Sequence, residues 1–392
     1  MSDLHYWNYP TDILCGVGAL EQLPRRCALA GARRPLLVTD PGMLALEPLR
    51  LVRECLERAG IDHDLFHELS SNPSLAEVQG GARRFEAGGH DALIALGGGS
   101  ALDAAKGIAL LSRDPQGLER FEWTQTLRSY PTLADYPLLG LPPLLALPTT
   151  AGTGSELGRE AVLTDTQLGI KRVVGHRELL AACVFLDPRL TRGLPPALSA
   201  ATGMDALTHA IEGYITKAAW EMTDMFHLKA IEIISKNLRG AVANTKEGRE
   251  GMALGQYVAG MGFSNVGLGI VHSMAHALGA VYDTPHGVAN AILLPTVMEY
   301  NAPATGEKYR EIARAMGVEG VDQMSQEEYR RAAVEAVKKL SQDVGIPADL
   351  KEIAKEEDVQ FLAESAYADA CRPGNPRDTS VEEIAALYRS LM

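Results

Sequence analysis

The chain lacks the sequence features of secreted, membrane-spanning and nucleic-acid-binding proteins. Its 5 cysteines are far apart and form no CxxC pair, which excludes a disulfide framework and a thiolate zinc site. Its 37 basic residues are outnumbered by 50 acidic ones, and the net charge of -13 repels nucleic acids and anionic lipid surfaces. The longest apolar stretch, residues 138–148, is about half a membrane span long. The first ten residues hold no apolar core of signal-peptide length, so we expect a cytoplasmic protein.

The amino-acid composition is that of a folded globular protein. Hydrophobic residues make up 46% of the 392 residues and charged residues 22%, which excludes a disordered or low-complexity chain. At about 150 residues per domain, this length predicts two domains. Any metal site must use nitrogen and oxygen ligands, because the cysteines are dispersed.

The first half of the chain alternates strand-like and helix-like segments. Residues 35–40 are a short β-rich run that ends in a turn, and residues 92–96 and 144–147 are continuous apolar runs, as expected for strands that are buried on both faces. Helical spacing of apolar residues is found at 49–59 and 101–111. Strands separated by helices predict βαβ units and a mostly parallel sheet.

The second half of the chain has mainly helical patterns, and prolines interrupt the sequence between the two halves. We therefore predict an α/β domain over residues 1–190, followed by an all-helical domain over residues 191–392. The predicted helices of the second domain cover residues 198–215, 223–238, 252–263, 270–281, 288–300, 326–344 and 381–391.

Two glycine-rich turns follow successive predicted strands of the first domain. Gly97-Gly-Gly-Ser100 opens a predicted helix, and Ser100 and Asp103 have the spacing of a capping box. Thr149-Thr-Ala-Gly-Thr-Gly-Ser-Glu156 follows the next strand. Either turn alone can be a simple strand-to-helix connection. Together they favour a dinucleotide site, because glycines and a helix N-terminus let backbone N–H groups approach phosphates at the carboxyl ends of strands.

Asp40 ends an earlier predicted strand of the same domain. A carboxylate at this position can accept a hydrogen bond from a ribose 2′-OH and would repel a 2′-phosphate. An aspartate before Pro41 is also common in ordinary turns, so both interpretations stay open.

Four histidines and an aspartate of the helical half have the spacing of metal ligands. Asp205 and His209 are four residues apart, as are His272 and His276, so each pair shares a helix face. His286 lies between a proline and a glycine that are typical of a turn. One carboxylate and three imidazoles would suit Fe(II), Zn(II), Mn(II), Co(II) or Ni(II). Five candidates exceed four ligand positions, so one is free for proton transfer, and the spacing does not say which.

The motifs together resemble those of the iron-activated, or group III, alcohol dehydrogenases over nearly the whole chain. The stretches that carry the resemblance are Gly97-Gly-Gly-Ser100 with Asp103 and Lys106, Thr149-Thr-Ala-Gly-Thr153, Gly203-Met-Asp-Ala-Leu-Thr-His-Ala-Ile-Glu-Gly213, residues 255–265, His272-x-x-x-His276, Pro285-His-Gly-Val-Ala-Asn290, and Cys371 with Gly374-Asn-Pro-Arg377.

This resemblance implies a set of site residues and a homodimer. It makes Asp205, His209, His272 and His286 the metal ligands, with Fe(II) preferred and Zn(II) as an alternative, and leaves His276 unliganded near the nicotinamide. Phe263, Leu268 and Cys371 would line the substrate pocket. The NAD contacts would be Asp40, Asn72, Gly98, Gly99, Ser100, Thr149, Thr150, Thr153 and Lys171, with Asp40 selecting NAD over NADP.

Glu160 departs from the pattern that the resemblance implies. It falls where the most similar enzymes of the family carry an uncharged residue that faces the substrate. A carboxylate there would favour polyhydroxy or amino alcohols and disfavour acids. The alternative is that Glu160 pairs with Arg159 or with another cation.

The expected activity is hydride transfer between NAD and a small primary alcohol or diol, of the 1,2-propanediol and lactaldehyde type. The substrate could instead be 1,3-propanediol, a larger polyol or an amino alcohol. A dehydroquinate synthase-like lyase would need basic residues for a phosphorylated acid, and no Lys or Arg occurs between Gly251 and Tyr300. A non-catalytic NAD sensor would need no metal ligands.

Overall fold

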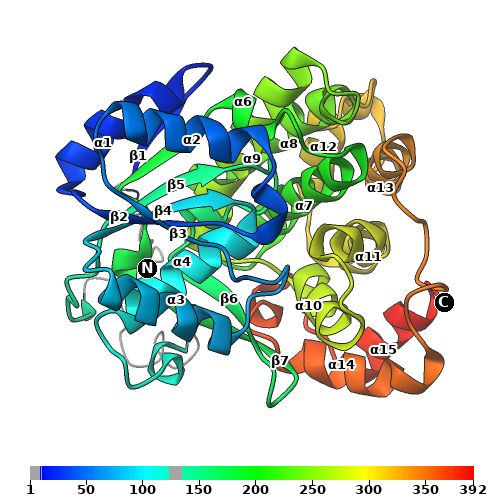
Figure 1. The fold of residues 1–392 in the computed structure, drawn as a ribbon. Coiled ribbons are helices and arrows are strands. Elements are labelled where there is room, and N and C mark those ends of the chain that lie inside the picture. The colour runs from blue at the N-terminus through cyan, green and yellow to red at the C-terminus, as the bar shows by residue number, and fades with distance from the viewer. Residues whose placement is uncertain (1–8, 10, 123–134) are drawn as a thin grey trace. The chain divides into compact units, whose positions relative to one another are not determined.

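The computed structural model describes Tyr9, residues 11–122 and residues 135–392, and almost all of the ten-residue start considered above lies outside this part. The described residues form two compact units (Figure 1). An α/β unit contains residues 11–122, 135–150 and 154–194. A helical unit contains residues 195–392 together with Tyr9 and residues 151–153.

The α/β unit is built on a six-stranded sheet in which every neighbouring pair of strands is parallel. The strand order is β1-β8-β5-β4-β2-β3, and β2, β4, β5 and β8 are buried along their whole length. This burial on both faces explains their uninterrupted apolar sequences. The strands are β1 Asp12–Cys15, β2 Pro35–Val38, β3 Asp64–Phe66, β4 Ala92–Gly97, β5 Leu144–Pro148 and β8 Cys183–Leu186.

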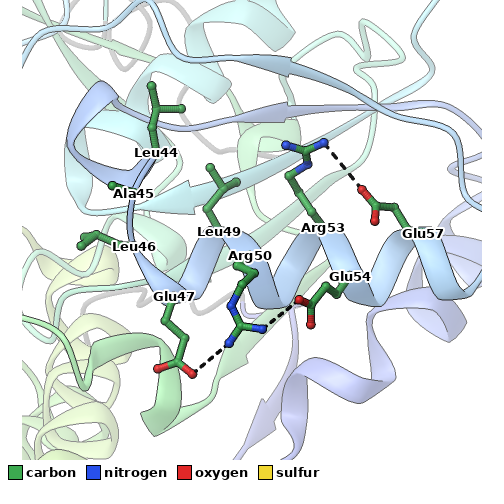
Figure 2. Close-up of a pocket in the computed structure, with 9 residues that line it drawn as sticks. All are labelled: Leu44, Ala45, Leu46, Glu47, Leu49, Arg50, Arg53, Glu54 and Glu57. Carbon is green, nitrogen blue, oxygen red and sulfur yellow. Dashed lines mark hydrogen bonds and ion pairs between the residues drawn. The ribbon is translucent and has the colours of Figure 1, made fainter.

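The helices of this unit pack on the sheet through apolar stripes. Helix α2 is an example, because Leu49 and Val52 join the core while Arg50 pairs with Glu47 and Glu54 on the outer side (Figure 2). The surface pocket along α2 in Figure 2 contains none of the predicted site residues. The helices are α1 Leu23–Ala30, α2 Glu47–Arg58, α3 Leu75–Ala87, α4 Gly99–Leu111 and the short α6 Pro188–Thr191.

An antiparallel hairpin is one of the elements of this unit that the sequence patterns did not predict, together with β1, β3, β8, α1, α3 and α6. It consists of β6 Glu160–Asp165 and β7 Ile170–Gly175, which are paired over six residues each. Alternate residues of β6 are buried, and Leu163 lies beside α4. The hairpin places Lys171 opposite Thr164.

The other helices of the helical unit surround α7, which is buried along almost its whole length. Such a helix has little amphipathic character, because neighbouring helices cover every side of it. No helix among the described residues is long and apolar enough to cross a membrane. The helices are α7 Pro196–Ile215, α8 Glu221–Val242, α9 Lys246–Val266, α10 Ile270–Tyr282, α11 His286–Asn301, α12 Lys308–Ala315, α13 Gln326–Asp343, α14 Val359–Ala368 and α15 Val381–Arg389.

The predicted fold class, a parallel sheet followed by helices, is confirmed. Helices α12 and α14 were missed, since 8 and 10 residues are too few for a clear apolar period. The predicted capping box of Ser100 and Asp103 is wrong. Gly98 is the N-cap of α4, so Ser100 already lies inside the first turn, and its hydroxyl donates to the carbonyl of Ser71 instead.

Candidate active site

Three helices of the helical unit bring carboxylate and imidazole groups together. Helix α7 carries Asp205 and His209, α10 carries His272 and His276, and α11 begins at His286. The predicted turn at His286 is thus the start of a helix, with Pro285 at the N-cap position. Because each pair on α7 and α10 is spaced by four residues, its two side chains emerge one turn apart on the same face.

Asp205, His272 and His286 converge on a common point. One ligand atom from each of them lies within 4.8 Å of the other two. The Oδ1 atom of Asp205 is 3.7 Å from Nε2 of His272 and 3.6 Å from Nε2 of His286. Asp205 and His272 are buried, whereas the His286 side chain is 41% exposed. The cluster therefore has one side that opens outward from the helical unit.

His209 lies next to this cluster without belonging to its tightest group. Its ring stacks on His272 at 4.6 Å between centroids, and on Phe263 at 4.3 Å. Its Nδ1 atom is buried and has no hydrogen-bond partner in the described part of the chain. Burial lowers the pKa of His209 to about 4, so the ring is neutral at physiological pH and has an available lone pair.

Asn290, one turn after His286 on α11, contacts all three converging residues. Its buried Nδ2 atom donates to Oδ1 of Asp205 at 2.7 Å, and it lies 3.2 Å from Nε2 of His272 and 3.1 Å from Nε2 of His286. These partners are acceptors that face one another, which is the arrangement that a cation requires.

Glu212 orients His272 from the side opposite the cluster. Its Oε2 atom is 2.6 Å from Nδ1 of His272, and its Oε1 atom accepts the backbone N–H of Val271 at 2.7 Å. Burial alone would lower the pKa of His272, but hydrogen bonds and charges of Asp205 and Glu212 raise it to about 9. Because a carboxylate only accepts, Nδ1 carries a hydrogen, and Nε2 would turn its lone pair toward the cluster once a metal ion displaces the second proton.

Asp369 orients His276 in a comparable way. Its Oδ2 atom is 2.8 Å from Nδ1 of His276, and Oδ1 accepts from Ser273 Oγ at 3.2 Å and from the backbone of Cys371 at 2.8 Å. The ring of His276 stacks on that of His286, with 5.3 Å between centroids. His276 is therefore beside the converging ligands but is held by a different carboxylate.

The residues present fit a divalent transition metal. An anionic carboxylate and neutral imidazoles are the nitrogen and oxygen donors that such ions bind. The ligand atoms of Asp205, His272 and His286 face one another within 4.8 Å. A bound cation would satisfy them, and Glu212 supplies the outer carboxylate that metal-binding histidines usually have.

The three predicted pocket residues of the helical unit lie near this cluster to different degrees. Phe263 covers the ring of His209, and Cys371 has its sulfur within 4.8 Å of ligand atoms of His276 and Asp369. Leu268 lies in the connection between α9 and α10, where its carbonyl accepts a hydrogen bond from Thr216 at 3.4 Å.

The glycine turn after β4 leaves space that side chains would fill. Gly97 has a φ of 154°, and a Cβ atom there would lie 2.7 Å from Cβ of Ala101 and 3.5 Å from the Asp40 carboxylate. A Cβ atom on Gly98 would lie 3.2 Å from Thr150. Helix α4 begins at Gly99 and has no side-chain cap, so its first N–H groups are free of a capping side chain. This cradle has room for the pyrophosphate of a dinucleotide, and the Asp40 carboxylate lies beside it.

The remaining predicted cofactor residues lie in three places. The Nζ atom of Lys171 donates to Oδ1 of Asn72 at 2.5 Å, and Ser100 bonds to the carbonyl of Ser71, so these residues are neighbours. Thr149 donates its backbone N–H to Gly97 at 2.9 Å. Thr153 belongs to the helical unit, unlike the other predicted cofactor residues.

Glu160 begins β6 of the α/β unit, so the structure places it in a different unit from the other pocket residues. Burial raises the pKa of its carboxyl group, against the charges of Arg159 and Lys106. Lys106 donates to the backbone carbonyl of Glu160 at 2.6 Å and not to its carboxylate. Within the described ranges the Glu160 carboxylate forms no ion pair, and its role in substrate choice stays a prediction.

Two family models match this chain, one in each half. The model of iron-containing alcohol dehydrogenases matches residues 10–188, and the model of the C-terminal part of the Fe-containing alcohol dehydrogenase family matches residues 199–392. The chain belongs to the iron-containing alcohol dehydrogenase family. It is therefore an oxidoreductase that interconverts alcohols and aldehydes, and the lyase and sensor alternatives are set aside.

Individual iron-containing alcohol dehydrogenases are similar along the whole chain. Lactaldehyde reductase of Escherichia coli K12 is 48% identical over 377 residues, which cover 96% of each chain. A solved structure of 1,3-propanediol oxidoreductase is 39% identical with a TM-score of 0.93, and all of both chains is covered. The structure of sulfoacetaldehyde reductase from Bifidobacterium kashiwanohense in complex with NAD⁺ is 26% identical with a TM-score of 0.85, covering 100% of this chain and 99% of that one.

Sequence reasoning assigned no role to Glu212, Asn290 or Asp369 of this iron-containing alcohol dehydrogenase. Two of them carried a usable signal, because Glu212 is seven residues after Asp205 and Asn290 is four after His286, on the same helix faces. Asp369 carried none, since its partner His276 is 93 residues away in sequence.

Proposed function

We propose that this chain is an NAD- and metal-dependent dehydrogenase that interconverts a small primary alcohol or diol and its aldehyde, of the 1,2-propanediol and lactaldehyde type. The observation that carries the proposal is the convergence of Asp205, His272 and His286 within 4.8 Å, in a chain that also has an uncapped helix start behind two glycines. The 48% identity to lactaldehyde reductase supports the substrate class.

The metal would be held by Asp205, His209, His272 and His286, with Fe(II) as the first choice from the family and Zn(II) as the alternative. When bound, a divalent cation supplies Lewis-acid chemistry that polarises a substrate oxygen and lowers the pKa of an alcohol. The chain's own contribution is preorganisation. Glu212 holds His272 in the tautomer whose Nε2 lone pair faces the cluster, and Phe263 shields His209 from water.

We infer that His276 moves the proton that the alcohol loses. Asp369 accepts the hydrogen of its Nδ1 atom, which leaves Nε2 as the acceptor and fixes the ring in place. Asp369 also stabilises the charged ring once it has taken a proton. Neither residue is one of the proposed metal ligands, so proton transfer and metal binding use separate carboxylates.

The dinucleotide would bind to the α/β unit, with its pyrophosphate at Gly98, Gly99 and the start of α4. NAD would serve as the hydride acceptor in alcohol oxidation and NADH as the donor in aldehyde reduction. The carboxylate of Asp40 would accept from the ribose 2′-OH and repel a 2′-phosphate, which favours NAD over NADP.

Glu160 favours a second candidate substrate class. The partly buried carboxylate of Glu160 can accept hydrogen bonds from hydroxyl or ammonium groups of a longer polyol or of an amino alcohol. The solved 1,3-propanediol oxidoreductase, with its 39% identity, supports a terminal diol as a further alternative.

The test is NADH oxidation by anaerobically purified protein, with and without added Fe(II), across lactaldehyde, 3-hydroxypropanal, glyceraldehyde and an amino aldehyde. An EDTA-treated sample is the control. We expect turnover that requires the metal, and the order of kcat/KM values assigns the substrate class. Absence of turnover on all aldehydes by a protein that contains metal would refute the proposal.

Elemental analysis of the same samples tests the choice of metal. Activity should follow iron content, because the family is iron-containing. Activity that follows zinc instead would overturn the preference for Fe(II), and it would leave the ligand assignment intact, since zinc binds the same donors more tightly.

A further inference from the structure

A second group of possible metal ligands lies beside the proposed active site and has no assigned role as a site. His276 on α10, Asp369 directly after α14 and Cys371 each offer one ligand atom, and these atoms all lie within 4.8 Å of one another. None of the three belongs to the Asp205, His272 and His286 cluster. We propose that His276, Asp369 and Cys371 form a second divalent-cation site, selective for Zn²⁺ and other thiophilic ions, which inhibits the enzyme when filled.

The donor set determines the selectivity. The second site contains a sulfur atom, whereas the first cluster contains only oxygen and nitrogen donors. Thiolate, imidazole and carboxylate are the three ligand types of protein zinc sites, and sulfur disfavours Mg²⁺ and Ca²⁺. Three protein ligands leave a fourth position for water.

The geometry of the site is largely preformed. Asp369 and Cys371 are two residues apart, and the backbone N–H of Cys371 donates to Oδ1 of Asp369 at 2.8 Å. Ser273 Oγ donates to the same oxygen at 3.2 Å, which ties this segment to α10, the helix that carries His276. The side chains are partly exposed, so an ion can reach them without unfolding of the segment.

The charge of the site matches a dication. The Asp369 carboxylate accepts hydrogen bonds from His276, from the backbone of Cys371 and from Ser273, and these donors stabilise its charged form. The carboxylate is thus charged throughout the neutral range. On coordination the Cys371 thiol loses its proton to solvent and becomes a thiolate. Carboxylate and thiolate together neutralise the two charges of the cation.

Occupation of this site would remove a group that the reaction needs. A cation on Nε2 of His276 uses the lone pair that would accept the proton. A cation on Nδ1 displaces the hydrogen from that atom, so the neutral ring carries its hydrogen on Nε2. In both cases Nε2 can no longer accept a proton. This inhibitory consequence rests on the proposed function, whereas the binding of the cation does not. Inhibition would differ from replacement of iron, because iron stays bound while activity falls.

Cobalt titration of the metal-free protein separates the two sites. We expect two equivalents of Co²⁺ per chain, and a near-ultraviolet thiolate-to-cobalt charge-transfer band that only a sulfur ligand can produce. C371S should bind one equivalent without the band, and D369N should lose most of the second equivalent. C15S removes the exposed cysteine of β1 and is the matched control, which should behave as the wild type.

Absence of the thiolate band in the wild type, or a band that survives in C371S, would overturn the proposal, whereas a single equivalent that gives the band would contradict the first site and leave the second standing. If C371S fails to fold, alkylation of the wild type replaces it: Zn²⁺ should protect Cys371 from iodoacetamide while Cys15 in the same sample stays reactive. Equal reaction of both cysteines with and without Zn²⁺ refutes the site. For the inhibitory role, Zn²⁺ added to iron-loaded enzyme should lower kcat at constant iron content, and a chelator should restore it. Full activity with Zn²⁺ bound would refute the inhibition alone.

Discussion

The two units of this protein build their binding sites from different parts of the chain. The α/β unit uses backbone, with glycines at 97 and 98 and the open start of α4, and its candidate side chains approach this cradle from the ends of strands. The helical unit uses buried side chains of three helices, each oriented by a second side chain. The backbone site needs glycines, because a side chain at these positions would fill the space for the ligand. The side-chain site needs each ligand residue and each residue that orients it. The helical unit should therefore be the more sensitive of the two to conservative substitutions.

The strongest test of this contrast is Asp205→Asn, which removes the negative charge of the proposed metal cluster. A Lewis-acid metal contributes several kcal/mol to the barrier, so we expect kcat/KM to fall by roughly 10³-fold. Metal content after dialysis against Fe(II) should fall too, while NADH affinity from fluorescence titration stays at the wild-type value. Normal metal content with normal activity would contradict the assignment of Asp205 as a ligand.

A smaller effect is expected for Glu212→Gln, which keeps the size of the side chain that orients His272. Loss of such an outer partner typically costs about 10–100-fold in metal affinity, because the tautomer of the histidine is no longer fixed. Competition with a chelator measures this affinity without reference to activity. Glu221→Gln, at the exposed start of α8, is the control and should leave it unchanged.

We also expect acid to destabilise the protein through the helical unit. His227 of α8 is buried against Gly213 and Gly262, and neither ring nitrogen has a hydrogen-bond partner in the part of the chain described. Burial lowers its pKa to about 3, below the ordinary value near 6.5, so stability is fully present above pH 6.5 and is lost as the pH falls toward 3.

Between pH 7 and pH 5 this protonation lowers the free energy of unfolding by about 2 kcal/mol. Denaturant unfolding of wild type and His227→Gln at both values should show that the variant loses less of its free energy of unfolding by about this amount. His63→Gln, at a partly exposed histidine of the α/β unit, controls for the loss of one histidine. The same pH dependence in H227Q and wild type would show that His227 is not responsible.

The smallest effect should come from Gly97→Ala, which probes the backbone site. The new Cβ atom would meet Ala101, and the φ of 154° is unfavourable for alanine, so we expect about 1–2 kcal/mol of strain and roughly tenfold weaker NADH binding. Cobalt or iron binding should not change. Gly16→Ala, with a φ of 122° and open space around it, should cost stability and leave NADH affinity alone.

Local patterns determined which residues are candidates. The spacing of Asp205 and His209, and of His272 and His276, follows from the 3.6-residue turn of a helix, and the glycines after β4 follow from the space that a phosphate needs. The buried strands of the sheet are equally local, since burial on both faces demands an uninterrupted apolar run. These features could be predicted because each depends on residues that are close together in the chain.

Tertiary structure decided how the candidates are paired. Glu212 reaches His272 over 60 residues of sequence, Asp369 reaches His276 over 93, and Lys171 reaches Asn72 over 99. No periodicity relates such partners, because the separation depends on how whole helices and hairpins pack. The same holds for Cys371, whose sulfur comes within 4.8 Å of His276 ligand atoms only through the packing of the segment after α14 beside α10. The sequence by itself thus determined the fold class and the kinds of ligand, and packing decided which carboxylate orients which histidine.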